Sequence, residues 1–137
     1  MVKVGDYEVK EGLYYSKDYL WVELEGGKAR IGITDYAQKQ LREILVVDLP
    51  SAGDEIEKGE PFGSVESAKT ISDLIAPLSG VVEEVNEKVV ENPALINEDP
   101  YGEGWLIIIS PTKLDEELKE LMDFDAAVKW HEELAKG

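Results

Sequence analysis

The residues that could do chemistry in this sequence centre on one lysine. Lys69 lies within residues 63–80, GSVESAKTISDLIAPLSG, between two stretches that favour strands. A lysine at the tip of such a hairpin holds its amine away from the core, where a modifying enzyme can reach it. An amide there would remove the charge and tether a cofactor close to partner active sites. A lysine that merely keeps a turn soluble would look the same, and the residues alone favour that plainer interpretation.

The sequence lacks the parts of an autonomous enzyme. It has no cysteine and a single histidine, His131, which we expect to face solvent in an acidic helical tail. No cluster has the spacing of metal ligands, and no glycine-rich phosphate loop is present. Carboxylates such as Glu83 and Glu84 are adjacent in sequence, so their side chains diverge and should be surface charge. We therefore predict a non-catalytic carrier or binding protein without a metal site.

Length and charge narrow the classes of partner. The chain has 137 residues, 43% of them hydrophobic, which suits one domain over residues 1–137. Its 30 Asp and Glu against 14 Lys and Arg give a formal net charge of −16, which disfavours nucleic acid and anionic membranes. The charge fits either steering toward basic partners or plain solvation. No apolar run approaches the roughly 20 residues of a membrane span, and no signal-peptide core is visible, so we expect a cytoplasmic protein.

Most of the chain is predicted to form short strands separated by turns. A tight hairpin turn is expected at Gly26-Gly27, between two stretches of alternating apolar and polar residues. Thr34 or Asp35 is expected to cap one short helix. The expected strands cover residues 21–25, 28–33, 44–49, 62–67, 71–76, 81–86 and 105–109.

The last part of the chain has the periodicity of helices. Two groups of apolar residues at helical spacing, separated by a break near residues 123–125, predict two helices in a tail of about residues 111–136. These helices are expected to pack outside a β core of about residues 13–110. Short strands with frequent turns favour a small sandwich or barrel.

The segment around Lys69 resembles the lipoyl attachment site of glycine cleavage H proteins. The matching residues are Glu66-Ser67-x-Lys69, Ser72-Asp73 and Ala76-Pro77-x-Ser79-Gly80. Further matches to the family are residues 32–38 (GITDYAQ), 49–54 (LPSAGD), 85–86, 92–93 and 96–105 (INEDPYGEGW). Because the matches run in order from about residue 14 to about residue 110, the resemblance is specific.

The resemblance implies a fold and a modified residue. The fold is mainly β, a barrel-sandwich hybrid of two small antiparallel sheets of the lipoyl/biotinyl-carrier type, with one short helix and a C-terminal helical tail. The cofactor is lipoate, attached to Lys69 as N6-lipoyllysine, with Glu66, Ser67 and Asp73 in support. Asp73 is expected either to hold the amine of the cargo or to order the hairpin.

The resemblance also implies a set of partners. Glycine decarboxylase (P protein) loads an aminomethyl group, a folate-dependent aminomethyltransferase (T protein) takes the one-carbon unit, and dihydrolipoyl dehydrogenase (L protein) reoxidises the arm. A lipoate-attaching enzyme is the fourth partner. The chain is thus expected to be a monomeric, non-catalytic aminomethyl carrier in glycine catabolism and one-carbon metabolism.

Two positions depart from the family pattern. Leu20 stands where a polar residue able to line the arm-docking cleft is common, and Gln40 stands where the short helix often has histidine. Attachment at Lys69 does not depend on either position. The departures therefore concern how the arm docks, not where it is attached.

Other functions fit parts of the sequence. The lipoyl domain of a 2-oxo acid dehydrogenase usually has Asp-Lys-Ala at the tip, where this chain has Ala68-Lys69-Thr70. A biotin carrier has methionines beside its lysine, and Met1 and Met122 are both remote. A relay that donates lipoate to other lipoyl enzymes stays open. The last alternative is a structural scaffold with no carrier role, in which Lys69 would stay unmodified even in cells that make lipoate.

Overall fold

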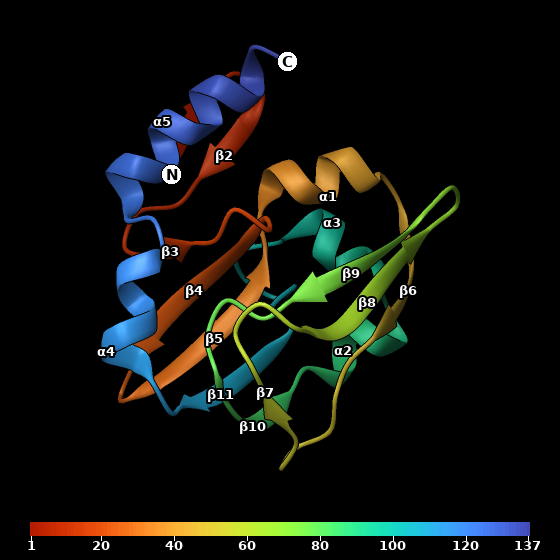
Figure 1. Cartoon of the computed structure of the whole chain (residues 1–137). Helices are drawn as coiled ribbons and strands as arrows, with labels where there is room; N and C mark the ends of the chain where they lie inside the picture. Colours follow the sequence, from red (N-terminus) through yellow and green to blue (C-terminus); the bar gives the residue numbers. More distant parts are fainter.

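The computed structural model describes all residues 1–137, and most of its regular structure is β (Figure 1). The strands are β1 (Val2–Val4), β2 (Tyr7–Val9), β3 (Tyr14–Tyr15), β4 (Leu20–Glu25), β5 (Lys28–Ile33), β6 (Ile44–Asp48), β7 (Glu55–Ile56), β8 (Pro61–Ser67), β9 (Ile71–Ile75), β10 (Gly80–Val85) and β11 (Ile107–Pro111). They form a six-stranded sheet in the order β3-β4-β5-β11-β10-β7, a three-stranded sheet β6-β8-β9 and a separate β1-β2 hairpin. The mainly β, antiparallel fold class is confirmed. The third sheet was not expected, and no sheet closes into a barrel.

Local signals in the sequence set the first large hairpin and the first helix. Gly26 and Gly27 both have positive φ, 58° and 78°, as the tight turn between β4 and β5 requires. Helix α1 (Asp35–Leu41) begins after Thr34, whose hydroxyl accepts a hydrogen bond from the Ala37 amide at 3.2 Å. Both predictions are confirmed, with Thr34 as the cap.

Four further helices lie outside the sheets. They are α2 (Glu87–Glu91), α3 (Ala94–Glu98), α4 (Leu114–Glu117), which a 3₁₀ turn η1 (Leu118–Glu120) extends, and α5 (Phe124–Ala135). The two helices predicted for the tail are confirmed as α4 with η1 and α5. Helices α2 and α3 were not predicted, because five residues are too few to show a helical period.

The core has two parts. The larger lies between the six-stranded and three-stranded sheets and includes Leu20, Ile31, Val65 and Leu74. The smaller lies under α5, which packs on β1, β2 and β3. The N-terminal residues therefore belong to a second packed layer outside the predicted β core (Figure 1).

Two glycines permit strands to approach closely. A side chain at Gly63 in β8 would collide with the backbone oxygen of Asp48 in β6, and one at Gly80 would collide with the backbone oxygen of Ser110 in β11. A residue with a Cβ at Gly63 would therefore push β6 away from the Lys69 hairpin, and one at Gly80 would push apart β10 and β11 of the six-stranded sheet.

His131 is buried, so the expectation that it faces solvent was wrong. Its Nδ1 donates a hydrogen bond to the Ala127 carbonyl at 2.7 Å, and its Nε2 has no partner. The acidic composition of the tail concealed this, because α5 turns His131 and Ala127 toward the N-terminal layer. Burial disfavours the charged imidazolium and lowers the pKa of His131 below its usual range.

We expect the buried His131 to make stability depend on pH. Because its pKa is lower in the folded chain, the unfolded chain takes up the proton first as the pH falls below about 6.5. The free energy of unfolding should therefore fall as the pH drops below about 6.5, by at most about 1.4 kcal/mol per pH unit, and be regained as the pH rises. Thermal or denaturant unfolding of the wild type and of His131→Phe across this range measures the effect.

The His131→Phe comparison also removes the contribution of net charge. Lowering the pH relieves repulsion in a chain of charge −16, and this relief is the same in both proteins. In His131→Phe, the free energy of unfolding should therefore no longer show the fall at low pH that His131 causes in the wild type. Parallel pH profiles for the two proteins would show that His131 has no part in it.

Candidate functional site

The tip of the β8-β9 hairpin presents Lys69 to solvent. Glu66 pairs with Ile71, and the Ser67 amide donates to the Thr70 carbonyl at 2.9 Å, which closes the turn. Residues 68–70 are all exposed, and the Lys69 amine takes part in none of the ion pairs of the molecule. The tip is thus an ordered hairpin that leaves one primary amine free.

The three residues expected to support Lys69 lie in different places. Ser67 is buried at the base of the tip, with its hydroxyl 3.5 Å from the Thr70 carbonyl. Glu66 is half-buried and pairs across the sheet with Ile71. Asp73 is exposed on the edge strand β9 and lines a pocket. Of the three, only Asp73 therefore lines the pocket into which an arm attached to Lys69 could fold.

The pocket lies between β9, α1 and the turn that precedes β4. It has a volume of about 210 Å³, and seven of its eleven lining residues are hydrophobic. A larger hollow of about 340 Å³ lies beside Glu55, Gly80 and Lys113, but its lining is mainly polar. The pocket residues are Asp18, Tyr19, Leu20, Ile33, Ala37, Gln40, Leu41, Val65, Ser72, Asp73 and Leu74.

The pocket lies within reach of a modified Lys69. Asp73 follows Lys69 by four residues, which is about 13 Å along an extended strand. A lysine side chain lengthened by an acyl chain covers a distance of this order. An arm lying along β9 would therefore bring its end to the pocket.

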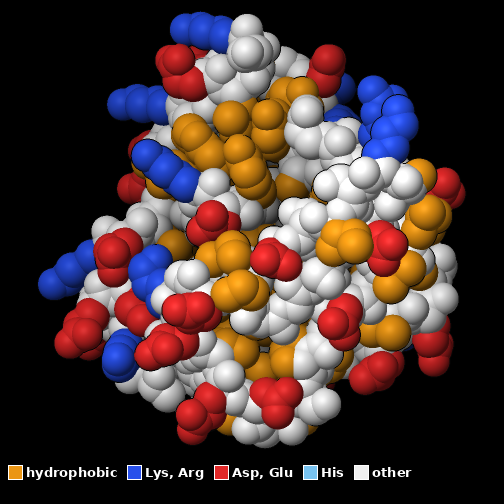
Figure 2. All heavy atoms as spheres, turned by 45° about the vertical axis from the view of Figure 1, so that its right-hand side comes forward, with side chains coloured by type: hydrophobic (Ala, Val, Ile, Leu, Met, Phe, Trp, Pro, Cys, Tyr) orange, Lys and Arg blue, Asp and Glu red, His pale blue; other side chains and the backbone are white.

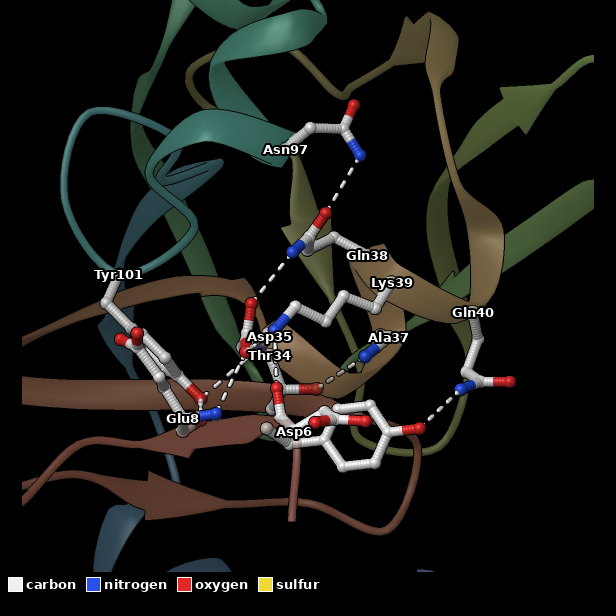
Figure 3. Close-up of polar contacts among 11 residues, drawn as sticks. Asp6, Glu8, Thr34, Asp35, Ala37, Gln38, Lys39, Gln40, Asn97 and Tyr101 are labelled. Carbon is white, nitrogen blue, oxygen red and sulfur yellow. Dashed lines mark hydrogen bonds and ion pairs between the residues drawn. The ribbon is translucent and has the colours of Figure 1, made fainter. Parts of the chain in front are cut away.

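A partly buried polar network fixes helix α1, one wall of the pocket (Figure 3). The Asp35 carboxylate accepts hydrogen bonds from the Glu8 amide and from the Gln38 side chain, each at 2.8 Å. The Asn97 side chain donates to Gln38 at 2.9 Å and to the Arg42 carbonyl at 2.7 Å. Because these bonds tie α1 to β2 and α3, its pocket wall is held in place before any ligand arrives.

Both residues that depart from the family pattern line the pocket. Leu20 is 2% exposed and contributes an apolar side chain to the pocket. Gln40 projects from α1, and its amide donates to the Tyr7 hydroxyl at 3.1 Å (Figure 3). Leu20 thus gives the pocket an apolar side chain, and Gln40 gives it an amide.

Sequence reasoning missed Asp18 and Tyr19 as pocket residues. Tyr19 has a φ of 72°, which is unusual for an aromatic residue and leaves no signal in the sequence. Its ring stacks on Tyr36 at 5.5 Å and on Trp130 of α5 at 5.4 Å between ring centroids. The C-terminal helix therefore helps to position one rim of the pocket.

A free lysine at a hairpin tip, beside a mainly apolar pocket lined by the same hairpin, is the arrangement that a carrier protein of the covalent-arm class requires. No group of three or more His, Asp or Glu side chains is placed to hold a metal ion, and no helix is long and apolar enough to cross a membrane. The sequence pattern of the glycine cleavage H-protein family matches residues 13–134. The chain therefore belongs to this family, whose members are lipoyl carriers of the glycine cleavage system.

Individual relatives agree with this assignment. The chain is 51% identical over 135 residues to a probable glycine cleavage system H protein of Thermococcus gammatolerans, covering 98% of this chain and 100% of that one. It is 52% identical over 113 residues to the H protein of Halalkalibacterium halodurans, covering 82% and 88%. A crystal structure of an H protein from Mycobacterium marinum superposes with a TM-score of 0.82 at 38% identity, covering 90% of this chain and 98% of that one.

Proposed function

We propose that Lys69 carries lipoate as N6-lipoyllysine and that the chain shuttles an aminomethyl group in the glycine cleavage system. It receives the group at glycine decarboxylase, delivers it at the aminomethyltransferase, and is reoxidised by dihydrolipoyl dehydrogenase. The observation that carries the proposal is the free amine of Lys69 at the tip of an ordered hairpin. The lipoyl group supplies the sulfur chemistry, and the chain supplies the position and reach of the arm.

The residues present fit such an arm. The pocket of about 210 Å³ has mainly apolar walls, which suit a hydrocarbon chain and a dithiolane ring. Asp18 and Asp73 both line it, and these carboxylates are suited to a primary ammonium on the cargo. Sheltering the arm there would keep water from the labile cargo between partners.

Attachment is tested by mass spectrometry of the purified protein. Incubation with lipoate, ATP and a lipoate–protein ligase should add one lipoyl group, which peptide fragmentation should place on Lys69. Protein from its native cells should carry the same group. A biotinyl group, or unmodified protein in cells whose other lipoyl enzymes are modified, would contradict the proposal.

Asp73 is expected to slow the loss of the cargo without affecting attachment. Because Asp73 is exposed, its interaction with an ammonium is worth less than about 1 kcal/mol, so Asp73→Asn should speed loss by no more than about fivefold. The measurement is the release of ammonia over time from loaded protein after the partner enzymes are removed. Asp48→Asn is the matched control, because Asp48 and Asp73 pair with the same residue, Ser64, and Asp48 does not line the pocket. Equal rates for the two variants would rule out the role.

A further inference from the structure

The outer face of the three-stranded sheet exposes large aliphatic side chains beside Lys69. Val46 of β6, Glu66 of β8 and Ile71 of β9 form one cross-strand row. Val46 is 49% exposed and Ile71 is 66% exposed, and Leu45, which the bulge in β6 leaves without a cross-strand partner, is 49% exposed. We name Leu45, Val46 and Ile71 the outer patch. Ile71 is only two residues from Lys69, so the outer patch reaches the hairpin tip.

The six-stranded sheet does not expose its outer residues in this way. Neighbouring strands β4 and β5 carry charged side chains there, and Arg30 pairs with Glu23 at 2.6 Å. Such ion pairs keep a sheet face soluble, whereas exposed aliphatic side chains gathered on one face mark an interaction site. The outer patch therefore has the character of an interaction site and not of an ordinary solvated surface.

The charges within the three-stranded sheet around the outer patch are negative, and the nearby basic residues are Arg42, before β6, and Lys69 at the hairpin tip. Glu66 lies in the same cross-strand row as Val46 and Ile71. Asp48 lies two residues further along β6, in the row of Asp73, and Glu43 is exposed just before β6. Lys69 is the only Lys or Arg between Lys58 and Lys88. Figure 2 brings this side of the molecule forward and shows apolar and acidic side chains interspersed on it. A partner that fits this face has an apolar centre and a basic rim.

We propose that the outer patch is the docking surface for the enzyme that attaches lipoate to Lys69, an inference that rests on the proposed function. In that reaction Lys69 Nζ attacks the acyl carbon of lipoyl adenylate, which the enzyme makes from lipoate and ATP. The new amide bond forms, the bond from the acyl carbon to the phosphate oxygen breaks, AMP leaves and the amine releases its proton to solvent.

The geometry favours this enzyme over the other partners. The attaching enzyme must bring its active site to Nζ itself, so it covers the residues beside Lys69. The enzymes of glycine cleavage instead meet the far end of the arm, at a distance that a flexible tether provides. Only the first kind of encounter requires a surface within two residues of the lysine.

The test is the kinetics of lipoylation by a lipoate–protein ligase, with the unmodified protein as the varied substrate. Ile71→Asp and Val46→Asp should each raise KM about tenfold and leave kcat within about twofold, because they charge the centre of the interface. Ile71→Thr, which keeps strand propensity, should give a smaller rise in the same direction. For the wild type, KM should rise with salt as the acidic rim is screened.

The control variant is Val2→Asp. Val2 is 38% exposed on β1, far from the hairpin, so this variant should keep the wild-type KM. Circular dichroism of each variant confirms folding. Absence of any lipoyl group on wild-type Lys69 would sink the proposed function, whereas wild-type KM values for Ile71→Asp and Val46→Asp would overturn only the docking surface. Loss of a wild-type dimer in Ile71→Asp would also overturn it, because the patch would then serve a second copy of the chain.

Discussion

Lys69→Arg is expected to lose lipoylation entirely and to reduce glycine-dependent NADH formation, in a system reconstituted with the three partner enzymes, to background. Arginine keeps the positive charge and the length of the side chain, but its guanidinium stays protonated and is a poor nucleophile toward an acyl group. Because residue 69 is exposed at a turn, the free energy of unfolding should change by less than about 0.5 kcal/mol. Intact mass, NADH formation and denaturant unfolding on one preparation separate loss of the arm from loss of the fold.

The matched control for Lys69→Arg is Lys88→Arg. The Lys88 side chain is 74% exposed and has only a distant carboxylate partner, Glu103, at 4.0 Å. Lys88→Arg should be lipoylated and active like the wild type. A lipoyl group on another lysine in Lys69→Arg, with activity retained, would contradict the assignment of the attachment site.

Trp21→Ala is expected to have the largest effect on stability, a loss of about 3–5 kcal/mol in the free energy of unfolding. Trp21 is fully buried, its ring packs over Gly32, and a side chain at Gly32 would collide with it. The indole N–H donates to the carbonyls of Ile33 at 3.1 Å and Pro100 at 3.0 Å. Alanine would leave a cavity in the smaller core, on the opposite face of β4 from Leu20 and the pocket.

Denaturant unfolding measures this loss as a fall in midpoint at constant slope. Trp21→Phe should lose less, about 1–2 kcal/mol, because it keeps most of the apolar volume and gives up the N–H donor. Trp105→Ala is the comparison for a tryptophan that is only half-buried, and it should also lose less than Trp21→Ala. An equal loss in Trp21→Ala and Trp105→Ala would show that burial of Trp21 does not dominate.

Features set by neighbouring residues could be predicted from the sequence. The Gly26-Gly27 turn needs two positive φ angles, which glycine adopts without strain, and both are present. The Thr34 cap needs only a hydroxyl that accepts a hydrogen bond from the backbone amide three residues later, at Ala37. Such local rules located the strands of the Lys69 hairpin and its tip. The roles of Lys69, Glu66, Ser67 and Asp73 stay predictions.

Features set by distant contacts could not be predicted. The β1 and β2 strands have three residues each, and only Val4 and Val9 are buried, so no alternation is visible. His131 is buried, and Tyr19 meets Trp130, because α5 docks on the N-terminal layer. That docking joins opposite ends of the sequence, and no short window contains both. One rim of the pocket was missed for the same reason.

The packing of α5 on the β1-β2 hairpin brings the two ends of the chain to one corner of the molecule. Gly5, in the turn of that hairpin, lies next to Ala135 at the end of α5. Figure 1 shows both termini there, well away from the tip of the β8-β9 hairpin. A bead, a surface or a fused domain attached at either end therefore holds the same corner and leaves the tip of the lysine hairpin clear of it.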